Sequence, residues 1–350
     1  MLSLSPHGGI RVLTEIANNL VEMGHEVKVI AGNLYTKPIY PFDARVQLEI
    51  LPHGRGRVHS YFNLIRQIPK WTNLGWLPVL NHALTFSAFL LPKRTLAQSV
   101  IVIQDMDWRG VKQPFGMLMQ LGGEITLKKH PAILAANPYL ANEIRLIGND
   151  VIGQLKLGIS KIFCSEDIQI SGKRDIDFLF FGRPQGRKRL SFYIEWVKHV
   201  VTMSPGIRIA AASQDKDVLA ILCKLTGVKV YQPSNDLELK QLYERSRFFL
   251  LASSAEGFAL PPLEAMGSGC IPVITECGGP SVYARHNDNS FVLTKESKPQ
   301  DVATFCSELF NCDTKKLDSL QVAGYRTSRE WVIDNFYNAN LIVTSFERLF

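Results

Sequence analysis

The chain has 350 residues, of which 46% are apolar and 20% are charged, with a formal net charge of +7. This length exceeds what one hydrophobic core usually supports, so we expect two domains. No uninterrupted apolar run reaches the roughly 18 to 20 residues needed to cross a bilayer, which excludes a helical membrane span and leaves a soluble or peripheral protein.

The cysteines and the amino end indicate a cytoplasmic protein. The six cysteines form no C-x-x-C pair, and several lie in apolar runs, so we interpret them as reduced thiols. The first apolar stretch is too short for a signal peptide, and no basic residues precede it.

The first thirty residues predict one β-α-β unit that begins abruptly. Leu2–Leu4 is a short strand, a turn containing Gly8 and Gly9 follows, and residues 10–23 carry apolar side chains at helical spacing before a strand at 26–31. The glycines lack the G-x-G-x-x-G spacing of a dinucleotide site, which argues against a nicotinamide enzyme. Because the first strand is so short, we expect that the amino terminus is truncated.

The positive charge is concentrated in the first half of the chain. Residues 1–163 hold 17 basic and 10 acidic side chains, and residues 51–100 hold six basic and no acidic ones, interleaved with aromatic residues. This mixture suits a peripheral contact with a membrane surface or an anionic lipid-linked acceptor. The alternative is that the aromatic side chains form core and the cations are solvated. No motif for nucleic-acid binding accompanies the charge.

A strand predicted at Val100–Ile103 ends in polar residues. Asp105 and Asp107 have the D-x-D spacing that binds a divalent metal in one class of glycosyltransferases, but so short a pattern is common by chance. Asp105 is also a candidate for hydrogen-bonding or deprotonating an acceptor hydroxyl. The alternative role for its carboxylate is to cap the next element.

Further strand and helix patterns complete the first domain and begin the second. Residues 132–136 and 139–147 predict a strand and a helix. Residues 155–163 look like the last strand of the first domain and the turn that follows it. We therefore expect a first domain at 1–165, a linker at 166–175, a second domain at 176–335, and a helix at 336–350 that returns to the first domain.

The second domain opens with a strand at 176–181 that runs into a basic loop, Gly182 to Arg189. Arg183 and Lys188 lie at the carboxyl end of this strand, where fixed cations stabilise the charge that accumulates on a departing diphosphate. Arg187 and Arg189 are better explained as surface or acceptor-side charges.

Two acids separated by seven residues bracket a predicted strand-to-helix turn. Residues 248–251 form an apolar strand, Glu256 lies in the following loop, and Glu264 lies on the helix that Pro261 and Pro262 begin. Ligands of open parallel sheets bind outside the carboxyl ends of the strands, so both acids can face one molecule. A second glycine-rich turn with Gly278 and Gly279 follows a strand at 271–274 and predicts an anion site.

The run from Glu256 to Glu264 resembles the E-x7-E motif of the retaining GT4 glycosyltransferases. The G-R-x-x-x-x-K loop from Gly182 to Lys188 and the paired glycines at both turns are similar to motifs of the same family. This resemblance covers most of the chain. It implies an α/β protein of the GT-B fold, with two Rossmann-like domains facing across a cleft and a carboxyl-terminal helix that crosses back to the first.

The resemblance also implies roles for individual residues. The catalytic group would be Glu256, Arg183 and Lys188, with Glu256 facing the donor sugar and the two cations holding its diphosphate. Asp105 joins this group as the candidate for the acceptor hydroxyl described above, and not through the resemblance. The donor-binding group would be Glu264, on the nucleotide ribose, with Gly257, Phe258, Ala259, Leu260, Gly278, Gly279 and Pro280. Gly8 and Gly9 would lie on the acceptor side, and no metal or other cofactor is expected.

Three departures from the family pattern affect the acceptor side and the second anion turn. Gln104 and Asp105 stand where many members carry a histidine, Ser160 replaces an aspartate, and the glutamate expected near residues 282–284 is absent. A similar Gln-Asp pair occurs in some members that assemble polysaccharides, including rhamnosyltransferases.

The expected function is transfer of a sugar from a nucleotide-diphosphate donor to a glycan or lipid-linked acceptor, in surface polysaccharide assembly at the inner face of the membrane. A nucleotide-sugar epimerase or a phosphorylase with the same diphosphate clamp is one alternative. The other is a non-catalytic partner protein. The intact cations and acids of the second domain favour transfer.

Overall fold

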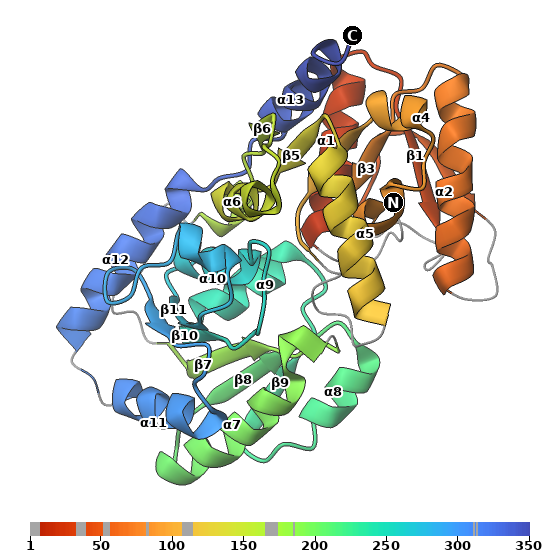
Figure 1. The fold of residues 1–350 in the computed structure, drawn as a ribbon. Helices are drawn as coiled ribbons and strands as arrows, with labels where there is room; N and C mark the ends of the chain where they lie inside the picture. The colour runs from red at the N-terminus through yellow and green to blue at the C-terminus, as the bar shows by residue number, and fades with distance from the viewer. Residues whose placement is uncertain are drawn as a thin grey trace. The chain divides into compact units, whose positions relative to one another are not determined.

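The computed structural model describes residues 8–32, 40–51, 57–81, 84–106, 115–164, 174–184, 186–310, 312 and 314–350. The chain forms two compact units (Figure 1). Unit 1 comprises residues 1–157 and 334–350, and unit 2 comprises residues 158–333. The expected strand at Leu2–Leu4, Asp107, and residues 165–173 of the expected linker region lie outside the described residues.

Unit 1 is built from short parallel strands and surrounding helices. Its described strands form a pair, β1-β2, and a four-stranded sheet in the order β3-β4-β5-β6. Strand β4 has the sequence VIVI and is buried along its whole length, as expected for a parallel strand covered on both faces. The elements of unit 1 are α1 (Gly8–Glu22), β1 (Lys28–Gly32), β2 (Gln47–Leu51), α2 (Arg57–Asn73), β3 (Val79–Asn81), α3 (Thr85–Ala88), α4 (Lys93–Ala97), β4 (Val100–Ile103), α5 (Phe115–Lys129), β5 (Ile133–Ala135), α6 (Pro138–Ile147), β6 (Gly153–Gln154) and α13 (Asn335–Glu347).

Unit 2 is a doubly wound α/β domain. Its six parallel strands have the order β12-β11-β10-β7-β8-β9, so the direction of winding reverses between β7 and β10. Helices α7 and α11 cover one face of this sheet, and α9, α10 and α12 cover the other (Figure 1). The elements are η3 (Lys161–Phe163), β7 (Ile176–Phe181), η4 (Gly186–Lys188), α7 (Leu190–Met203), β8 (Ile209–Ala212), α8 (Lys216–Leu222), β9 (Val228–Tyr231), α9 (Asp236–Glu244), β10 (Ser246–Leu251), α10 (Leu260–Gly267), β11 (Ile271–Thr275), η5 (Gly279–Val282), β12 (Phe291–Leu293), α11 (Pro299–Phe310) and α12 (Thr314–Glu330).

Aromatic residues of β7 pack on both faces of this sheet because successive strand side chains point in opposite directions. Phe178 stacks on Phe248 at 4.9 Å and Phe180 on Tyr193 at 4.7 Å, both between ring centroids. Phe181 instead lies 5.7 Å from the ring of Tyr243 on α9. Burying such a ring contributes about 1.5–3 kcal/mol, so these contacts fix the carboxyl end of β7 firmly.

The strand expected at the start of residues 155–163, before a turn, is not formed, because β6 ends at Gln154. Residues 161–163 form the 3-10 helix η3, and Ile159 makes a single bridge to Val332, in which its N–H donates to the Trp331 carbonyl at 2.8 Å. A Cβ on Gly158 would lie 1.9 Å from that carbonyl oxygen. The apolar spacing therefore reflects a close crossing of two segments of unit 2 and not a sheet strand.

The helical spacing near the carboxyl end is interrupted. Helix α12 ends at Glu330 and α13 begins at Asn335, where the Asp334 carboxylate accepts a hydrogen bond from the Tyr337 N–H at 2.9 Å. Such a capping bond starts a new helix. Helix α13 belongs to unit 1, as the resemblance implied for the last helix. None of the helices in the described ranges combines the length and apolar character needed to cross a bilayer.

The buried histidine of unit 1, His130, should make stability depend on pH. Its Nδ1 accepts the Ala132 N–H at 3.1 Å. Its Nε2 lies 3.0 Å from the Ser99 hydroxyl, which itself donates to the Leu96 carbonyl. The ring is therefore neutral with its proton on Nε2, and burial lowers its pKa from 6.5 to about 4.

Because the unfolded chain binds this proton more tightly, stability should be complete above the unfolded pKa and fall as the pH drops from 6.5 toward 4. The expected loss between pH 7.5 and pH 5 is about 2 kcal/mol. Urea unfolding at both pH values measures it. His130→Gln should remove most of this slope, and His25→Gln, at an exposed position, should keep it. An unchanged slope in His130→Gln would contradict the assignment.

Candidate functional site

The candidate site of unit 2 lies where the winding of the sheet reverses. The loop from Gly182 to Arg189 leaves the carboxyl end of β7, and the loop from Ala252 to Ala259 leaves the carboxyl end of the neighbouring strand β10. In doubly wound folds this reversal point opens a crevice between the two loops, and ligands bind there. The topology therefore brings the basic loop and the acidic loop to one place.

An ion pair joins the two loops. The Lys188 Nζ lies 2.6 Å from both carboxylate oxygens of Glu256. The Glu256 residue is only 7% exposed, and 24% of the Lys188 side chain is accessible. A buried carboxylate needs such a partner, because an unpaired charge loses its hydration without compensation.

Backbone hydrogen bonds hold the acidic loop between its neighbours. The Ser254 N–H donates to the Arg187 carbonyl at 2.8 Å on one side. On the other side, the Glu256 N–H donates to the Cys277 carbonyl at 2.7 Å, and the Gly279 N–H donates to the Glu256 carbonyl at 2.8 Å. The three loops that follow β7, β10 and β11 thus form one hydrogen-bonded layer.

Glu264 lies on α10 and is bound by a buried tyrosine. The Tyr243 hydroxyl donates to Glu264 Oε2 at 3.1 Å, and the Glu264 residue is 9% exposed. Burial and the Glu264 carboxylate raise the pKa of Tyr243 well above its usual value, while the charge of Arg183 opposes the rise. Arg183 therefore lies within electrostatic range of this pair.

A second buried tyrosine, Tyr283, has a hydroxyl pKa that both acids affect. Burial, followed by Cys277, Glu256 and Glu264, raises the pKa of its hydroxyl. Both carboxylates therefore lie within electrostatic range of the Tyr283 hydroxyl. This hydroxyl donates to the Ala259 carbonyl at 2.6 Å.

Ala259 adopts a left-handed conformation immediately before α10, with φ 63° and ψ 86°. This conformation costs an L-residue about 1–2 kcal/mol, so neighbouring contacts must impose it. The first N–H groups of a helix lack partners within the helix and favour anions. In α10, Leu260 is followed by Pro261 and Pro262, which carry no N–H, so the strained residue sets the direction of its own N–H and that of Leu260.

Gly279 permits the close approach of two loops. A Cβ at this position would lie 2.4 Å from the Phe258 nitrogen and 2.5 Å from the Gly257 carbonyl carbon. Both are backbone atoms that cannot move aside without displacing the acidic loop. The neighbouring Gly278 has φ 92°, which favours glycine as well.

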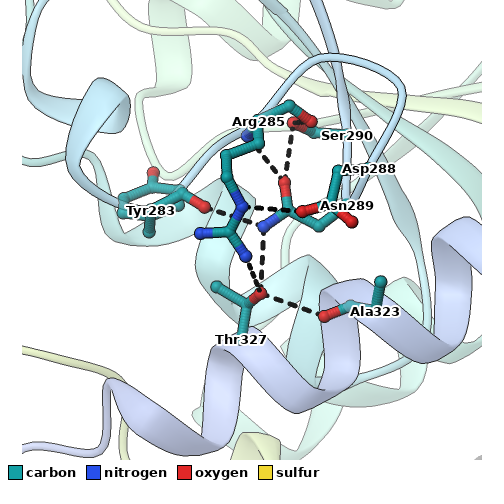
Figure 2. Close-up of polar contacts among 7 residues, drawn as sticks. All are labelled: Tyr283, Arg285, Asp288, Asn289, Ser290, Ala323 and Thr327. Carbon is teal, nitrogen blue, oxygen red and sulfur yellow. Dashed lines mark hydrogen bonds and ion pairs between the residues drawn. The ribbon is translucent and has the colours of Figure 1, made fainter.

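Polar contacts centred on the buried Asn289 hold the backbone of Tyr283 in place (Figure 2). The Asn289 amide donates to the Tyr283 carbonyl at 2.8 Å and to the Thr327 hydroxyl at 2.9 Å, and its oxygen accepts the Arg285 N–H at 2.7 Å. Thr327 in turn donates to the Ala323 carbonyl on α12. Asn289 is fully buried, so these bonds fix the segment that carries Tyr283.

The expected acceptor-side residues belong to unit 1. Gly8 and Gly9 form the first turn of α1, and the Gln104 amide donates to the Gly9 carbonyl at 3.2 Å. The Asp105 carboxylate accepts the N–H of Met106 at 2.7 Å. The amino end of α1 and the carboxyl end of β4 thus meet.

No cluster of three or more metal-binding side chains (His, Cys, Asp or Glu) occurs in the part of the chain that the structure describes. Asp107, the second member of the D-x-D pattern, lies outside that part.

Four residues around the candidate site of unit 2 carry no signal in the sequence. Tyr243, Tyr283 and Asn289 are described above, and the Trp331 ring lies 5.5 Å from that of Phe258, which packs between Trp331 and Tyr283. Only the tertiary structure reveals which side chains they contact.

Comparison with known proteins agrees with this arrangement. Residues 165–327, which make up most of unit 2, match the family model described as glycosyl transferases group 1. A GDP-mannose:cellobiosyl-diphosphopolyprenol alpha-mannosyltransferase of Komagataeibacter xylinus is 26% identical over 159 residues, which are 43% of this chain and 40% of that protein. The alignments span about half the length, or less, of the curated relatives that the chain matches.

Solved structures extend the likeness to both units. WaaG, a glycosyltransferase involved in lipopolysaccharide biosynthesis, has a TM-score of 0.73 at 15% identity and covers 98% of each chain. Anabaena Alr3699/HepE in complex with UDP-glucose has a TM-score of 0.67 at 13% identity, covering 99% of this chain and 98% of that one. The chain therefore has the GT-B fold.

Proposed function

We propose that this protein is a retaining, GT4-like glycosyltransferase that moves a sugar from a nucleotide-diphosphate donor to an acceptor hydroxyl. One observation carries the proposal. At the reversal point of the unit 2 sheet, the buried Glu256 carboxylate is paired with Lys188 of the basic loop after β7, and the buried Glu264 follows on α10. A nucleoside diphosphate sugar needs these groups together, since its ribose and sugar hydroxyls suit carboxylates and its diphosphate suits cations.

The donor diphosphate would lie between Arg183, Lys188 and the amino end of α10. Gly257, Phe258 and Ala259 lead into that helix, and Leu260 is its first residue, so the N–H groups of Phe258, Ala259 and Leu260 lie at its start. The turn formed by Gly278, Gly279 and Pro280 would lie beside the diphosphate, although Pro280 carries no N–H and the Gly279 N–H donates to the Glu256 carbonyl. Glu264 would accept hydrogen bonds from the ribose.

The Lys188–Glu256 ion pair explains how an acid can lie beside a diphosphate. Before donor binding, Lys188 Nζ contacts both oxygens of Glu256. In the proposed complex, Lys188 turns toward the phosphate and Glu256 accepts hydrogen bonds from sugar hydroxyls. The carboxylate then stabilises the positive charge that develops on the anomeric carbon.

In the proposed reaction the acceptor oxygen forms a bond to the anomeric carbon as the bond from that carbon to the donor phosphate oxygen breaks. Both events occur on the same face of the sugar, so the configuration is retained. The acceptor proton passes to the departing phosphate oxygen, and Arg183 and Lys188 stabilise the charge on that group. No metal or other cofactor is part of this proposal.

Acceptor binding is assigned to unit 1. We propose that Gly8 and Gly9 let the acceptor approach the amino end of α1, and that Asp105 accepts a hydrogen bond from the attacking hydroxyl. A glycan or lipid-linked acceptor in surface polysaccharide assembly fits the basic and aromatic composition of residues 51–100, which would contact the inner face of the membrane. Rhamnose is one candidate for the sugar.

Titration calorimetry with UDP-, GDP-, ADP- and dTDP-sugars in the presence of EDTA tests the donor site. One nucleotide class should bind to the wild type. Glu264→Ala should weaken it by about 10-fold to 100-fold, because a charged hydrogen-bond partner of the ribose is lost. Glu308→Ala, an exposed position on α11, serves as the control and should bind like the wild type.

The other outcomes distinguish the alternatives. Failure to bind any nucleotide sugar would contradict the donor site and favour a non-catalytic partner protein. Binding that requires added Mn²⁺ would contradict metal-independent transfer and draw attention to Asp105 and Asp107. Release of a free epimerised nucleotide sugar without an acceptor would identify an epimerase.

A further inference from the structure

We infer that two buried tyrosines position the two ends of the donor site. Tyr243 sets the carboxylate of Glu264 for the nucleoside, and Tyr283 sets Ala259 and the amino end of α10 for the diphosphate. This inference rests on the proposed function. Tyr243 lies outside the sequence motifs of the site, Tyr283 lies where the second glycine-rich turn lacks its expected glutamate, and each acts through another residue.

Tyr243 is fully buried, and its ring is fixed on several sides. It contacts Phe163 at 6.2 Å, Phe181 at 5.7 Å and Phe249 at 5.5 Å between ring centroids. The hydroxyl therefore occupies a fixed position, and its hydrogen bond to Glu264 Oε2 selects one orientation of the carboxylate. A bond to a charged partner in a buried site is stronger than one between neutral groups.

Tyr283 positions the other end of the loop, next to the start of α10. Its ring lies 5.6 Å from Phe258 and 6.3 Å from Trp331, and its hydroxyl donates to the Ala259 carbonyl at 2.6 Å. That carbonyl belongs to the residue with the strained left-handed backbone. The hydrogen bond therefore stabilises the left-handed conformation of Ala259 and, with it, the direction in which α10 begins.

Asn289 fixes Tyr283 from the opposite side. It binds the Tyr283 carbonyl and links it to Thr327 on α12, as Figure 2 shows. Ser290 also donates from its hydroxyl to the Asn289 amide oxygen at 3.1 Å. Tyr283 is therefore held at both ends, through its carbonyl by Asn289 and through its hydroxyl at Ala259.

A tyrosine that serves packing alone can be replaced by phenylalanine without loss of ligand affinity. Tyr243→Phe and Tyr283→Phe keep every ring contact and remove only the hydroxyl. The two variants are matched controls for each other, because both residues are buried in unit 2 and each contacts a different part of the loop. Their ligand preferences should therefore differ.

The test measures binding of the nucleoside and of its diphosphate, for the base that the wild type selects. Tyr243→Phe should weaken both ligands by about tenfold, since both carry the ribose. Tyr283→Phe should weaken the diphosphate by about tenfold and change nucleoside binding by less than twofold. Asn289→Asp removes the hydrogen bond to the Tyr283 carbonyl. Like Tyr283→Phe, it should weaken binding of the diphosphate more than binding of the nucleoside.

A double mutant separates positioning from a general loss of structure. In a Glu264→Gln background, Tyr243→Phe should cause much less than its additional tenfold loss, because the bond it removes no longer orients a charged carboxylate. Equal affinities in all variants, or equal losses of both ligands in both single variants, would overturn the inference. Failure of the wild type to bind the diphosphate would instead overturn the proposed function.

Discussion

Glu256→Gln is expected to reduce sugar transfer by about 10²–10³-fold, while nucleotide binding changes only a few-fold. Glutamine keeps the size of the side chain and one oxygen acceptor, but it cannot stabilise a developing positive charge. It also ends the ion pair in which Lys188 Nζ lies 2.6 Å from both oxygens. Release of the nucleoside diphosphate from the donor sugar measures the rate, with or without an acceptor.

Glu195→Gln is the matched control for this prediction. It makes the same chemical change at an exposed position of α7 in the same unit, and it should leave the rate unchanged. A Glu256→Gln protein that turns over its donor as fast as the wild type would show that this carboxylate has no part in the reaction.

Gly279→Ala is expected to destabilise unit 2 by about 2–3 kcal/mol and to abolish measurable diphosphate binding. The new methyl group would lie 2.4 Å from the Phe258 nitrogen, so the loops after β10 and β11 must separate. Their separation breaks the hydrogen bond from the Gly279 N–H to the Glu256 carbonyl. Urea unfolding and calorimetry measure the two effects.

Gly186→Ala is the matched control for stability. Nothing lies within 4 Å of a Cβ at that position, so the same methyl group enters open space. Its unfolding free energy should stay within about 0.5 kcal/mol of the wild type. A Gly279→Ala protein as stable as this control would contradict the close packing of the two loops.

Much of the parallel framework can be predicted from short apolar runs. The strands at 100–103 and 176–181 have the predicted bounds, because buried parallel strands are continuously apolar and end in polar loops. Once β7 and β10 are identified, the rule for open sheets directs attention to the loops at their carboxyl ends. For the same reason, Glu256 and Glu264 can be singled out before the fold is known.

Contacts that depend on tertiary structure cannot be predicted in this way. The sequence suggests a diphosphate for Lys188 and a sugar for Glu256, whereas in the structure the two side chains bind each other. Opposite charges on neighbouring loops attract each other, and a motif describes only the residue types present. Similarly, no local pattern indicates that Tyr243 reaches Glu264 from another helix.

The strand expected within residues 155–163 is absent for a related reason. Its alternating apolar residues satisfy the pattern of a strand, but a strand also needs a neighbour with a matching edge. The structure provides only one bridge, from Ile159 to Val332, and the 3-10 helix η3 follows. These alternating apolar residues are buried against a crossing segment. Such burial requires the same spacing of apolar side chains as pairing in a sheet.

The most direct test of the donor site is hydrogen–deuterium exchange of the full chain, with and without the nucleoside diphosphate that binds. The proposed site predicts slower exchange in residues 182–189, 254–264 and 277–283, and unchanged exchange at the opposite, amino-terminal ends of the unit 2 strands. Protection confined to unit 1, or protection in unit 2 that avoids these three loops, would contradict the assignment of this site.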